Sequence, residues 1–219
     1  MNRFLPFFII ASVALITAAV ATMLYRSKQH TYASTIPARA ADARLKPGHV
    51  RGPARAPVTL EEFGDFQCPA CATTAKTIDS LANTFGDRLR LVFWQFPLPA
   101  HEHGREAALA AEAASQQGRF WEMHRLLYTN QASWSGSKEV RPQFERFAEE
   151  LHLDPERFRK DIDNPSVAAR VDAEHEYGVS RGVKGTPTLF INGAEFPPPF
   201  TPERLREAIE NALKQPNKS

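Results

Sequence analysis

Both cysteines of this 219-residue chain lie in the stretch Phe66-Gln67-Cys68-Pro69-Ala70-Cys71. Random placement gives two cysteines this spacing about once in a hundred times, so the pair predicts a shared chemical role. A disulfide between them closes so short a loop that it removes little entropy from the unfolded chain. The spacing instead suits a pair of thiols that alternates between the dithiol and the disulfide.

A helix is expected to begin directly after Cys68. Proline is favoured at the first helical position, where its missing N–H has no partner to lose, and Pro69 fits that position. Apolar residues then recur at helical spacing as far as Gly86, which predicts the end of the helix. The recurring residues are Ala75, Ile78, Leu81, Ala82 and Phe85.

This helix start gives the two cysteines different roles. The first N–H groups of a helix have no partner inside it, and their dipoles stabilise a negative charge. We expect Cys68 to be the exposed thiolate that attacks and forms a mixed disulfide, with a pKa below the ~8.5 of an ordinary thiol. Cys71, one turn into the helix, is expected to be more buried and to resolve the mixed disulfide. Buried structural thiols and a zinc site are weaker alternatives, since zinc needs four ligands and the chain has no second cysteine pair.

The rest of the domain predicts a sheet interrupted by helices. Val58–Phe63 and Leu89–Trp94 are apolar, β-favouring runs on either side of the first helix, which gives a βαβ unit. Helical spacing and pairs of a capping residue with proline predict several helices between about residues 100 and 180. Thr188–Ile191 and the turn at Asn192-Gly193 predict a hairpin, and one more helix follows it. This order fits a sheet with a helical segment inserted in its middle.

The first 25 residues predict an export segment. Phe4–Tyr25 carries no charge, and at ~1.5 Å per residue such a helix can cross a ~30 Å hydrocarbon core. Two interpretations stay open. Residues 4–25 are an uncleaved anchor in the inner (cytoplasmic) membrane, or they belong to a signal peptide cleaved at Ala19-Val20-Ala21, after which the protein is secreted. The apolar run continues past that cleavage site, which favours the anchor. In both cases we expect the body of the protein on the periplasmic side, and a cytoplasmic body is the weaker alternative.

A single domain is expected to follow this segment. Residues 26–50 are polar and rich in Ala, Arg, Ser, Thr, Pro and Gly, which predicts a linker. Residues 51–214 have the usual size of one domain, and residues 215–219 form a polar tail. The net charge is only +2, with acidic and basic residues interspersed. Nucleic acid is therefore not an expected partner, because proteins that bind it concentrate basic residues on one face.

Two motifs of the chain resemble the DsbA-like branch of the thioredoxin superfamily. They are residues 62–71, from Glu62 to Cys71, and residues 183–193, which include Gly-Thr-Pro-Thr at 185–188. Phe96-Pro97-Leu98-Pro99 with the following His101 is similar to a third stretch of that branch. The resemblance covers about residues 50–213 and implies the thioredoxin fold. This is an α/β fold with a central mixed sheet flanked by helices, here with an inserted helical subdomain. It also implies an enzyme, a protein thiol–disulfide oxidoreductase that works outside the cytoplasm.

The resemblance also implies roles for residues outside the cysteine pair. In that branch the proline equivalent to Pro187 is a cis proline beside the disulfide, which leaves the Thr186 backbone free to pair with a substrate's extended chain. An acidic residue at the place of Glu62 lies under the active site and relays protons for the second cysteine. A carboxyl group buried there has a raised pKa and can act near neutral pH. Glu61 is expected to point to the opposite face of the strand.

The two residues between the cysteines, Pro69 and Ala70, are expected to tune the redox potential. The best-known strong oxidase of the branch has histidine at the place of Ala70, so the disulfide is expected to be less oxidising here. No cofactor is expected beyond the redox-active Cys68–Cys71 disulfide itself, and no metal. His101 and His103 are poor metal ligands, because residues two apart near a helix start do not face the same way.

The leading hypothesis is a dithiol oxidase that introduces disulfides into cysteine-containing exported proteins through a mixed disulfide. A membrane or extracytoplasmic redox partner is expected to recycle it. A reductase or isomerase that uses the same pair stays open, because the sequence does not fix the direction of electron flow. A membrane-tethered copper-handling module of the same fold is weaker, since copper favours a Met or His ligand near the thiols and the chain has three Met.

Overall fold

The structure is a computed structural model that describes residues 48–214. The expected anchor or signal segment (residues 1–25), most of the expected linker (26–50) and the polar tail (215–219) lie outside the described residues. Within residues 48–214, no helix combines the length and the apolar character that crossing a membrane requires.

The described residues form one mixed sheet. Its strands are β1 (His49–Arg51), β2 (Val58–Gly64), β3 (Leu89–Gln95), β4 (Thr188–Ile191) and β5 (Ala194–Phe196). They lie in the order β1-β3-β2-β4-β5. Strands β2 and β3 are parallel, and every other neighbouring pair is antiparallel. A parallel pair needs a crossover connection. The first helix supplies it, which confirms the expected βαβ unit and the mixed sheet.

Strand β1 corrects the predicted domain boundary. It begins at His49, inside the stretch assigned to the linker (residues 26–50), so the domain assigned to residues 51–214 starts earlier. Three residues are too few for a periodic pattern. The strand is set instead by its pairing with residues 91–93 of β3, far along the chain.

Helices cover both faces of the sheet. Helices α3 (Pro69–Phe85) and α10 (Pro202–Lys214) lie on one face, where they share an apolar cluster with Leu60 of β2. Helix α9 (Pro165–Ser180) covers the opposite face, against Phe63. The two faces follow from the alternation of side chains along a strand, since Leu60 and Phe63 stand an odd number of positions apart.

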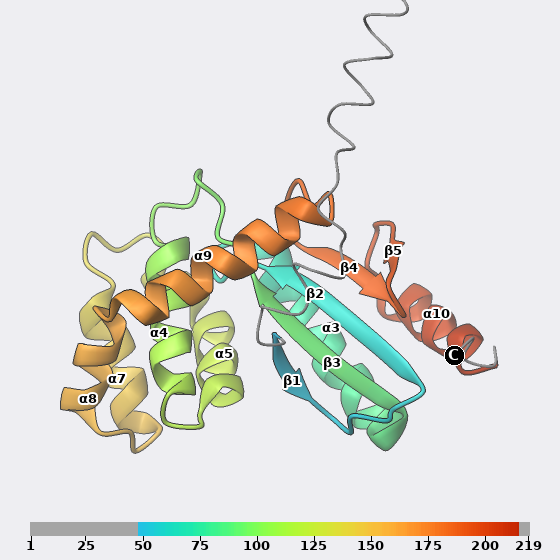
Figure 1. Cartoon of the computed structure of the whole chain (residues 1–219), viewed down its shortest axis with the longest axis horizontal. Helices are drawn as coiled ribbons and strands as arrows, with labels where there is room; N and C mark the ends of the chain where they lie inside the picture. Colours follow the sequence, from blue (N-terminus) through green and yellow to red (C-terminus); the bar gives the residue numbers. More distant parts are fainter. Residues whose placement is uncertain (1–47, 215–219) are drawn as a thin grey trace, which may run out of the picture. The chain divides into compact units, whose positions relative to one another are not determined.

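A helical subdomain lies between β3 and α9. Its helices are α4 (Gly104–Ser115), α5 (Phe120–Thr129), α6 (Gln131–Trp134), α7 (Arg141–Glu150) and α8 (Pro155–Ile162). Figure 1 shows α4, α5, α7 and α8 gathered to one side of the sheet, with α9 running from them to the sheet. Helix α4 is rich in alanine, and its small side chains are completely buried between the surrounding helices. The expected inserted subdomain is thereby confirmed.

The edge of the sheet is a short hairpin. Asn192 and Gly193 turn the chain between β4 and β5 with φ angles of 48° and 81°. Such left-handed angles are typical of an Asn-Gly turn. Residues 197–199 are all proline and follow β5 directly, so the strand ends after three residues because proline has no N–H for the ladder.

Candidate active site

Cys68 lies at the junction of strand β2 and helix α3. Its backbone is extended (φ −73°, ψ 120°), so it caps α3, and Pro69 takes the first turn as predicted. Cys71 is completely buried one turn into the helix. Only 7% of Cys68 is exposed, less than expected, because the backbone oxygen of Thr186 lies 3.4 Å from its sulfur.

The two free thiols differ in acidity. A hydrogen bond with the Cys71 thiol makes the largest contribution and lowers the pKa of Cys68 to about 5. The backbone N–H groups of Ala70 and Cys71, in the first turn of α3, add to this effect. Burial raises the pKa of Cys71, and the neighbouring Cys68 and Glu62 raise it further. At neutral pH Cys68 is therefore a thiolate and Cys71 a thiol.

The loop before β4 brings Thr186 and Pro187 to the cysteine pair. Their peptide bond is cis, as the resemblance implies, and the backbone oxygen of Thr186 lies 3.4 Å from the sulfur of Cys68. Thr186 and Pro187 line a groove of about 720 Å³ together with Ala70 and Phe200. They also line a second groove of about 390 Å³, together with Lys184. The loop therefore has room beside it for an extended chain.

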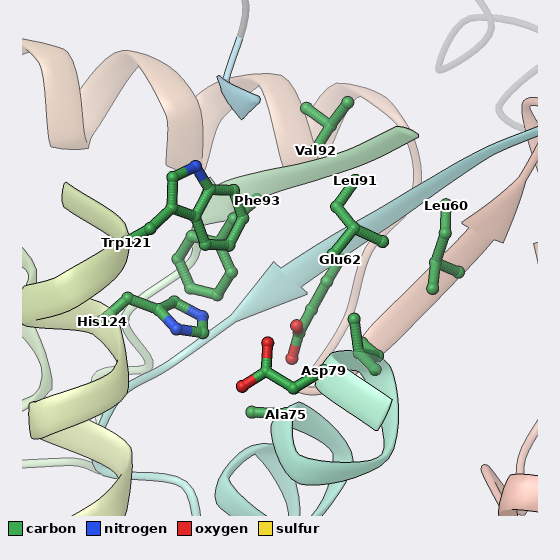
Figure 2. A pocket seen from close by; sticks show the side chains of 10 residues that line it. Leu60, Glu62, Ala75, Asp79, Leu91, Val92, Phe93, Trp121 and His124 are labelled. Carbon is green, nitrogen blue, oxygen red and sulfur yellow. The ribbon is translucent and has the colours of Figure 1, made fainter. Parts of the chain in front are cut away.

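Glu62 is the buried member of the Glu61–Glu62 pair. It is 5% exposed, and Figure 2 shows its carboxyl group facing Asp79. Burial makes the largest contribution and the charge of Asp79 the next, and together they raise the pKa of Glu62 to about 8. Glu61 accepts a hydrogen bond from Nε1 of Trp94 at 3.0 Å, on the other face of the sheet. The fold therefore brings Glu62, and not Glu61, to the side of α3.

Asp65 organises the active-site loop and is not among the residues that the sequence predicts. Its buried carboxylate accepts hydrogen bonds from the backbone N–H groups of Gln67 (2.8 Å) and Leu98 (2.7 Å). The same carboxylate lies 2.7 Å from Nδ1 of His101. An Asp that bonds the N–H two positions later is a common turn, which is the local signal for this role. Asp65 thus fixes the loop before Cys68 to the segment after β3.

His101 and His103 face different partners. His101 pairs with Asp65, whereas Nε2 of His103 lies 2.7 Å from the backbone oxygen of Ser137. The two rings therefore contact different segments of the chain.

Gln131 of α6 ties the helical subdomain to the active-site loop. Its side-chain nitrogen donates hydrogen bonds to the backbone oxygens of Phe66 (2.7 Å) and Cys68 (2.9 Å). The side-chain nitrogen of Gln67, in the active-site loop, donates a hydrogen bond to the backbone oxygen of Ser135 in the helical subdomain at 2.9 Å. Sequence reasoning missed both glutamines, since no spacing or pattern links position 131 to position 68.

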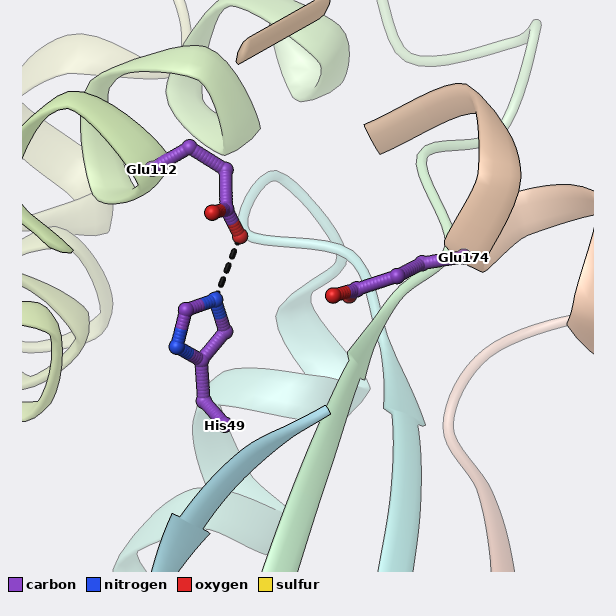
Figure 3. A group of neighbouring side chains, drawn as sticks. All are labelled: His49, Glu112 and Glu174. Atoms are coloured by element: carbon purple, nitrogen blue, oxygen red, sulfur yellow. Dashed lines mark hydrogen bonds and ion pairs between the residues drawn. The ribbon is translucent and has the colours of Figure 1, made fainter. Parts of the chain in front are cut away.

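A buried ionic cluster joins β1 to the helices. Figure 3 shows His49, Glu112 and Glu174 converging from β1, α4 and α9, with His49 Nε2 2.5 Å from Glu112. Their ligand atoms lie within 4.8 Å of one another, a spacing that metal sites use. Arg170, however, forms ion pairs of 2.9 Å with both carboxylates. Its guanidinium supplies the positive charge that a cation would bring, so the cluster is an ionic tie.

The arrangement of Cys68, Cys71 and Pro187 agrees with a family match. A family model described as Thioredoxin covers residues 44–211. The chain belongs to this family. The match confirms the expected place in the thioredoxin superfamily.

Solved structures similar to this thioredoxin-family chain include several oxidoreductases. A thioredoxin-like oxidoreductase from Silicibacter pomeroyi DSS-3 is 28% identical, with a TM-score of 0.64 over 77% of this chain and 93% of its own. BdbD from Bacillus subtilis is 24% identical, with a TM-score of 0.68 over 78% and 97%. The thiol-disulfide exchange protein alpha-DsbA2 from Wolbachia pipientis is 17% identical, with a TM-score of 0.67 over 79% and 90%. The predicted α/β thioredoxin fold is confirmed, and the predicted enzyme class agrees with the family.

The curated relatives that match the chain are named as antiporters. The Na⁺/H⁺ antiporter NhaA 3 of Salinispora tropica is 39% identical over 167 residues, which are 75% of this chain and 24% of the relative. The Na⁺/H⁺ antiporter NhaA of Herminiimonas arsenicoxydans is 41% identical over 145 residues, or 66% and 22%. The chain thus spans about a quarter of the length of these relatives. The similarity concerns one segment of them, and ion transport is not assigned to this chain.

Proposed function

We propose that the protein is an extracytoplasmic thiol–disulfide oxidoreductase that oxidises cysteine pairs in exported proteins. In this proposal a substrate thiolate attacks Cys68 and Cys71 is the leaving thiol, which resolves the mixed disulfide when the reaction runs in the opposite direction. Thr186 and Pro187 bind the extended substrate, and Glu62 relays a proton. The observation that carries the proposal is the difference in acidity between two thiols one helical turn apart. No cofactor is proposed beyond the Cys68–Cys71 disulfide.

The reaction begins on the oxidised enzyme, when a substrate thiolate attacks the sulfur of Cys68. A bond forms between the two sulfurs, the Cys68–Cys71 bond breaks, and its electron pair leaves on Cys71. Cys71 has a raised pKa and takes a proton, which Glu62, with a pKa of about 8, can donate. A second substrate thiolate then attacks the substrate sulfur of the mixed disulfide. Cys68 leaves as a thiolate, and the substrate keeps the new disulfide.

The low pKa of Cys68 favours oxidation as the direction. A stabilised thiolate makes the reduced enzyme more stable, so the disulfide becomes a stronger oxidant. Ala70 has no imidazole to add to this effect, and the stabilisation comes from the Cys71 thiol and the first-turn N–H groups.

The reduction potential of the Cys68–Cys71 pair tests the direction. It is measured by equilibrating the pure protein with glutathione buffers and counting free thiols. A potential well above the about −270 mV of thioredoxin supports the oxidase, and a potential near that value supports the reductase instead. Refolding of an oxidised substrate protein that carries scrambled disulfides separates an isomerase from both.

We further propose that residues 4–25 hold the domain at the outer side of the cytoplasmic membrane, where a membrane or extracytoplasmic redox partner reoxidises it. The uncharged run at the N-terminus and the DsbA-like fold support this location. A C-terminal alkaline phosphatase fusion is expected to be active, and an inactive fusion would contradict export. Carbonate washing of the membranes distinguishes an anchored protein, which stays bound, from a protein secreted after cleavage.

A further inference from the structure

A small cavity lies beneath Glu62, on the face of the sheet that α3 covers. Its volume is about 10 Å³, roughly the room that one buried water needs. Figure 2 shows the carboxyl groups of Glu62 and Asp79 and the ring of His124 around this space, which they reach from β2, α3 and α5. Most of the other lining residues are apolar.

Two polar atoms at this cavity have no hydrogen-bond partner among residues 48–214. They are Oε1 of Glu62 and Nε2 of His124, and each residue is only 5% exposed. Buried polar atoms are almost always paired with protein or with ordered water. A water in the cavity can satisfy both atoms, since it needs two to four polar partners and the lining supplies three polar side chains.

Asp79 connects the cavity to the surface. Its side chain is 38% exposed, and Oδ1 accepts a hydrogen bond from Nη2 of Arg51 at 2.7 Å. Arg51 lies in turn over the ring of Trp121, 5.2 Å from its centre, at the wall of the same cavity. A cavity with room for one water therefore separates the buried carboxyl group of Glu62 from the partly exposed carboxylate of Asp79.

We propose that this cavity holds a water that links Glu62 to Asp79 and is the route by which Glu62 exchanges protons with solvent. His124 is a positioning residue in this route, because its Nε2 holds the water while Phe93 and Tyr128 fix its ring from the sides. The inference rests on the proposed function, in which Glu62 supplies the proton of Cys71.

The route carries one proton inward and one outward in each catalytic cycle. When the Cys68–Cys71 bond breaks, Cys71 keeps the electron pair and takes the proton of Glu62, which leaves a buried carboxylate. The water passes this carboxylate a proton from Asp79, and Asp79 takes one from solvent. When the redox partner re-forms the disulfide and takes up two electrons, Cys71 loses its proton, and one proton leaves from Glu62 through the water and Asp79 to solvent.

The charges around Glu62 fit such a route. Because its pKa lies at about 8, the carboxyl group of Glu62 can hold and release a proton near neutral pH. Burial lowers the pKa of His124 to about 3, so the ring stays neutral and orients the water without taking its proton. The other titratable or charged groups that act on this region come from several elements. They are Cys68, Cys71, Asp65, Tyr128, His49 and Arg51.

Three variants of the full-length protein separate a proton route from a structural role. Asp79→Asn removes the outlet carboxylate, whereas Arg51→Met removes the same ion pair and keeps the carboxylate. His124→Phe keeps an aromatic ring and removes Nε2. Oxidation of a synthetic dithiol peptide is followed through the first and later turnovers, with glutathione disulfide as the oxidant that re-forms the Cys68–Cys71 disulfide. The rates are measured in H₂O and D₂O from about pH 6 to about pH 9. The melting temperature of each variant is measured beside it.

The first turnover uses the proton already on Glu62, so we expect it to keep the wild-type rate in all three variants at about pH 6, well below the pKa of about 8 that Glu62 has in the wild type. Later turnovers of Asp79→Asn and His124→Phe are expected to slow about tenfold, less than the ~100-fold or more that loss of a direct proton-transfer group costs. The loss should be largest at high pH, where protons are scarce, and should raise the solvent isotope effect. Arg51→Met is expected to keep most of its turnover.

The inference and the proposed function fail in different ways. Active Cys68→Ala protein would overturn the proposed function. Inactive Cys68→Ala together with wild-type later turnovers in Asp79→Asn would leave the function intact and overturn only the water route. An equal loss in Asp79→Asn and Arg51→Met would overturn it as well, since that result points to the ion pair. If His124→Phe does not fold, the later turnovers of Asp79→Asn still test the water route, because Asp79 is partly exposed and its replacement should be tolerated.

Discussion

The sulfur of Cys68 lies 3.4 Å from the backbone oxygen of Thr186, a residue 118 positions later in the chain. The residue proposed to pair with the substrate backbone therefore touches the sulfur proposed to react with it. A substrate chain bound along Thr186 carries its own cysteine to Cys68, so binding and orientation come from one contact.

The two cysteines are expected to respond differently to removal. Cys68→Ala should abolish the oxidation of substrate dithiols, because the sulfur that forms the mixed disulfide is gone. Cys71→Ala should accumulate mixed disulfides, because its Cys68 thiolate still attacks substrate disulfides and the Cys71 thiol that would release the substrate is missing. Non-reducing gels of cells that express each variant measure both outcomes. Trapping by the Cys68 variant instead would reverse the assignment.

The acidity of Cys68 is expected to depend on Cys71. Ultraviolet titration of the reduced protein should show a thiolate that forms near pH 5. In Cys71→Ala the pKa of Cys68 should rise by about one unit or more, because the hydrogen bond that contributes most is lost. Cys71→Ser keeps a hydroxyl donor and is the matched control, with a smaller rise expected. An unchanged pKa in Cys71→Ala would show that the helix N–H groups suffice.

The raised pKa of Glu62 is expected to make stability fall as pH rises. Between the unfolded value of 4.5 and the folded value of about 8, the unfolded chain releases a proton that the folded protein keeps. Its contribution to stability is present below pH 4.5 and lost as pH rises through about 8. Glu62→Gln should remove this slope and stabilise the protein above that pH by roughly 3–6 kcal/mol.

Urea unfolding of Glu62→Gln on both sides of this pH range measures the effect. Glu61→Gln is the matched control, since its side chain lies on the other face of the same strand, and it should keep the wild-type slope. The proton-relay proposal adds that Glu62→Gln slows exchange without unfolding the protein. An unchanged exchange rate would contradict the relay.

A methyl group at Gly104 is expected to disturb the Asp65 loop. A Cβ there would lie 2.7 Å from Oδ1 of Asp65, whose carboxylate is already held by three partners. Gly104→Ala should therefore cost about 1–3 kcal/mol of stability and slow exchange at Cys68. Gly136→Ala is the control, because nothing lies within 4 Å of its Cβ, and should change stability by less than ~0.5 kcal/mol. Thermal unfolding and exchange rates measure both.

The buried ion pairs of Arg170 are expected to contribute more to the free energy of unfolding than ion pairs on the surface do. Arg170→Ala leaves Glu112 and Glu174 buried without their counter-charge, which should cost about 3–5 kcal/mol. Arg105→Ala breaks an ion pair with Asp172 in which both side chains are about half exposed, and it should cost less than ~1 kcal/mol. Chemical denaturation of both variants compares them. Equal losses would mean that the buried cluster contributes no more than a surface pair.

The elements that the sequence predicted well are those with a local signal. Pro69 marks the start of α3 whatever the rest of the chain does, and the apolar run at Leu89–Trp94 marks a buried strand. The Asn192-Gly193 turn needs only its own two residues. Strand β1 had no such signal, because three residues carry no period and its pairing partner lies on β3.

The parts of the site that the sequence missed depend on contacts between distant segments. Gln131 reaches the Cys68 oxygen only because α6 folds back over the loop. Nothing local places His124 at the same cavity as Glu62. The expected exposure of Cys68 was too high for the same reason, since the Thr186 loop that covers it arrives from another part of the chain.

Helix α9 gives the active site a mechanical link to the helical subdomain. Arg170 pairs with Glu112 of α4, and Glu174 accepts a hydrogen bond from the backbone N–H of Gln95 in β3. At Gly178 the helix lies so close to Phe96 that a Cβ would come within 2.6 Å of the ring. The chain then needs only a few residues to reach Thr186. Because α9 is held at both of these points, it should move as a rigid body with the helical subdomain. We therefore expect a rotation of the subdomain to shift the Thr186 loop and to widen or narrow the groove beside it.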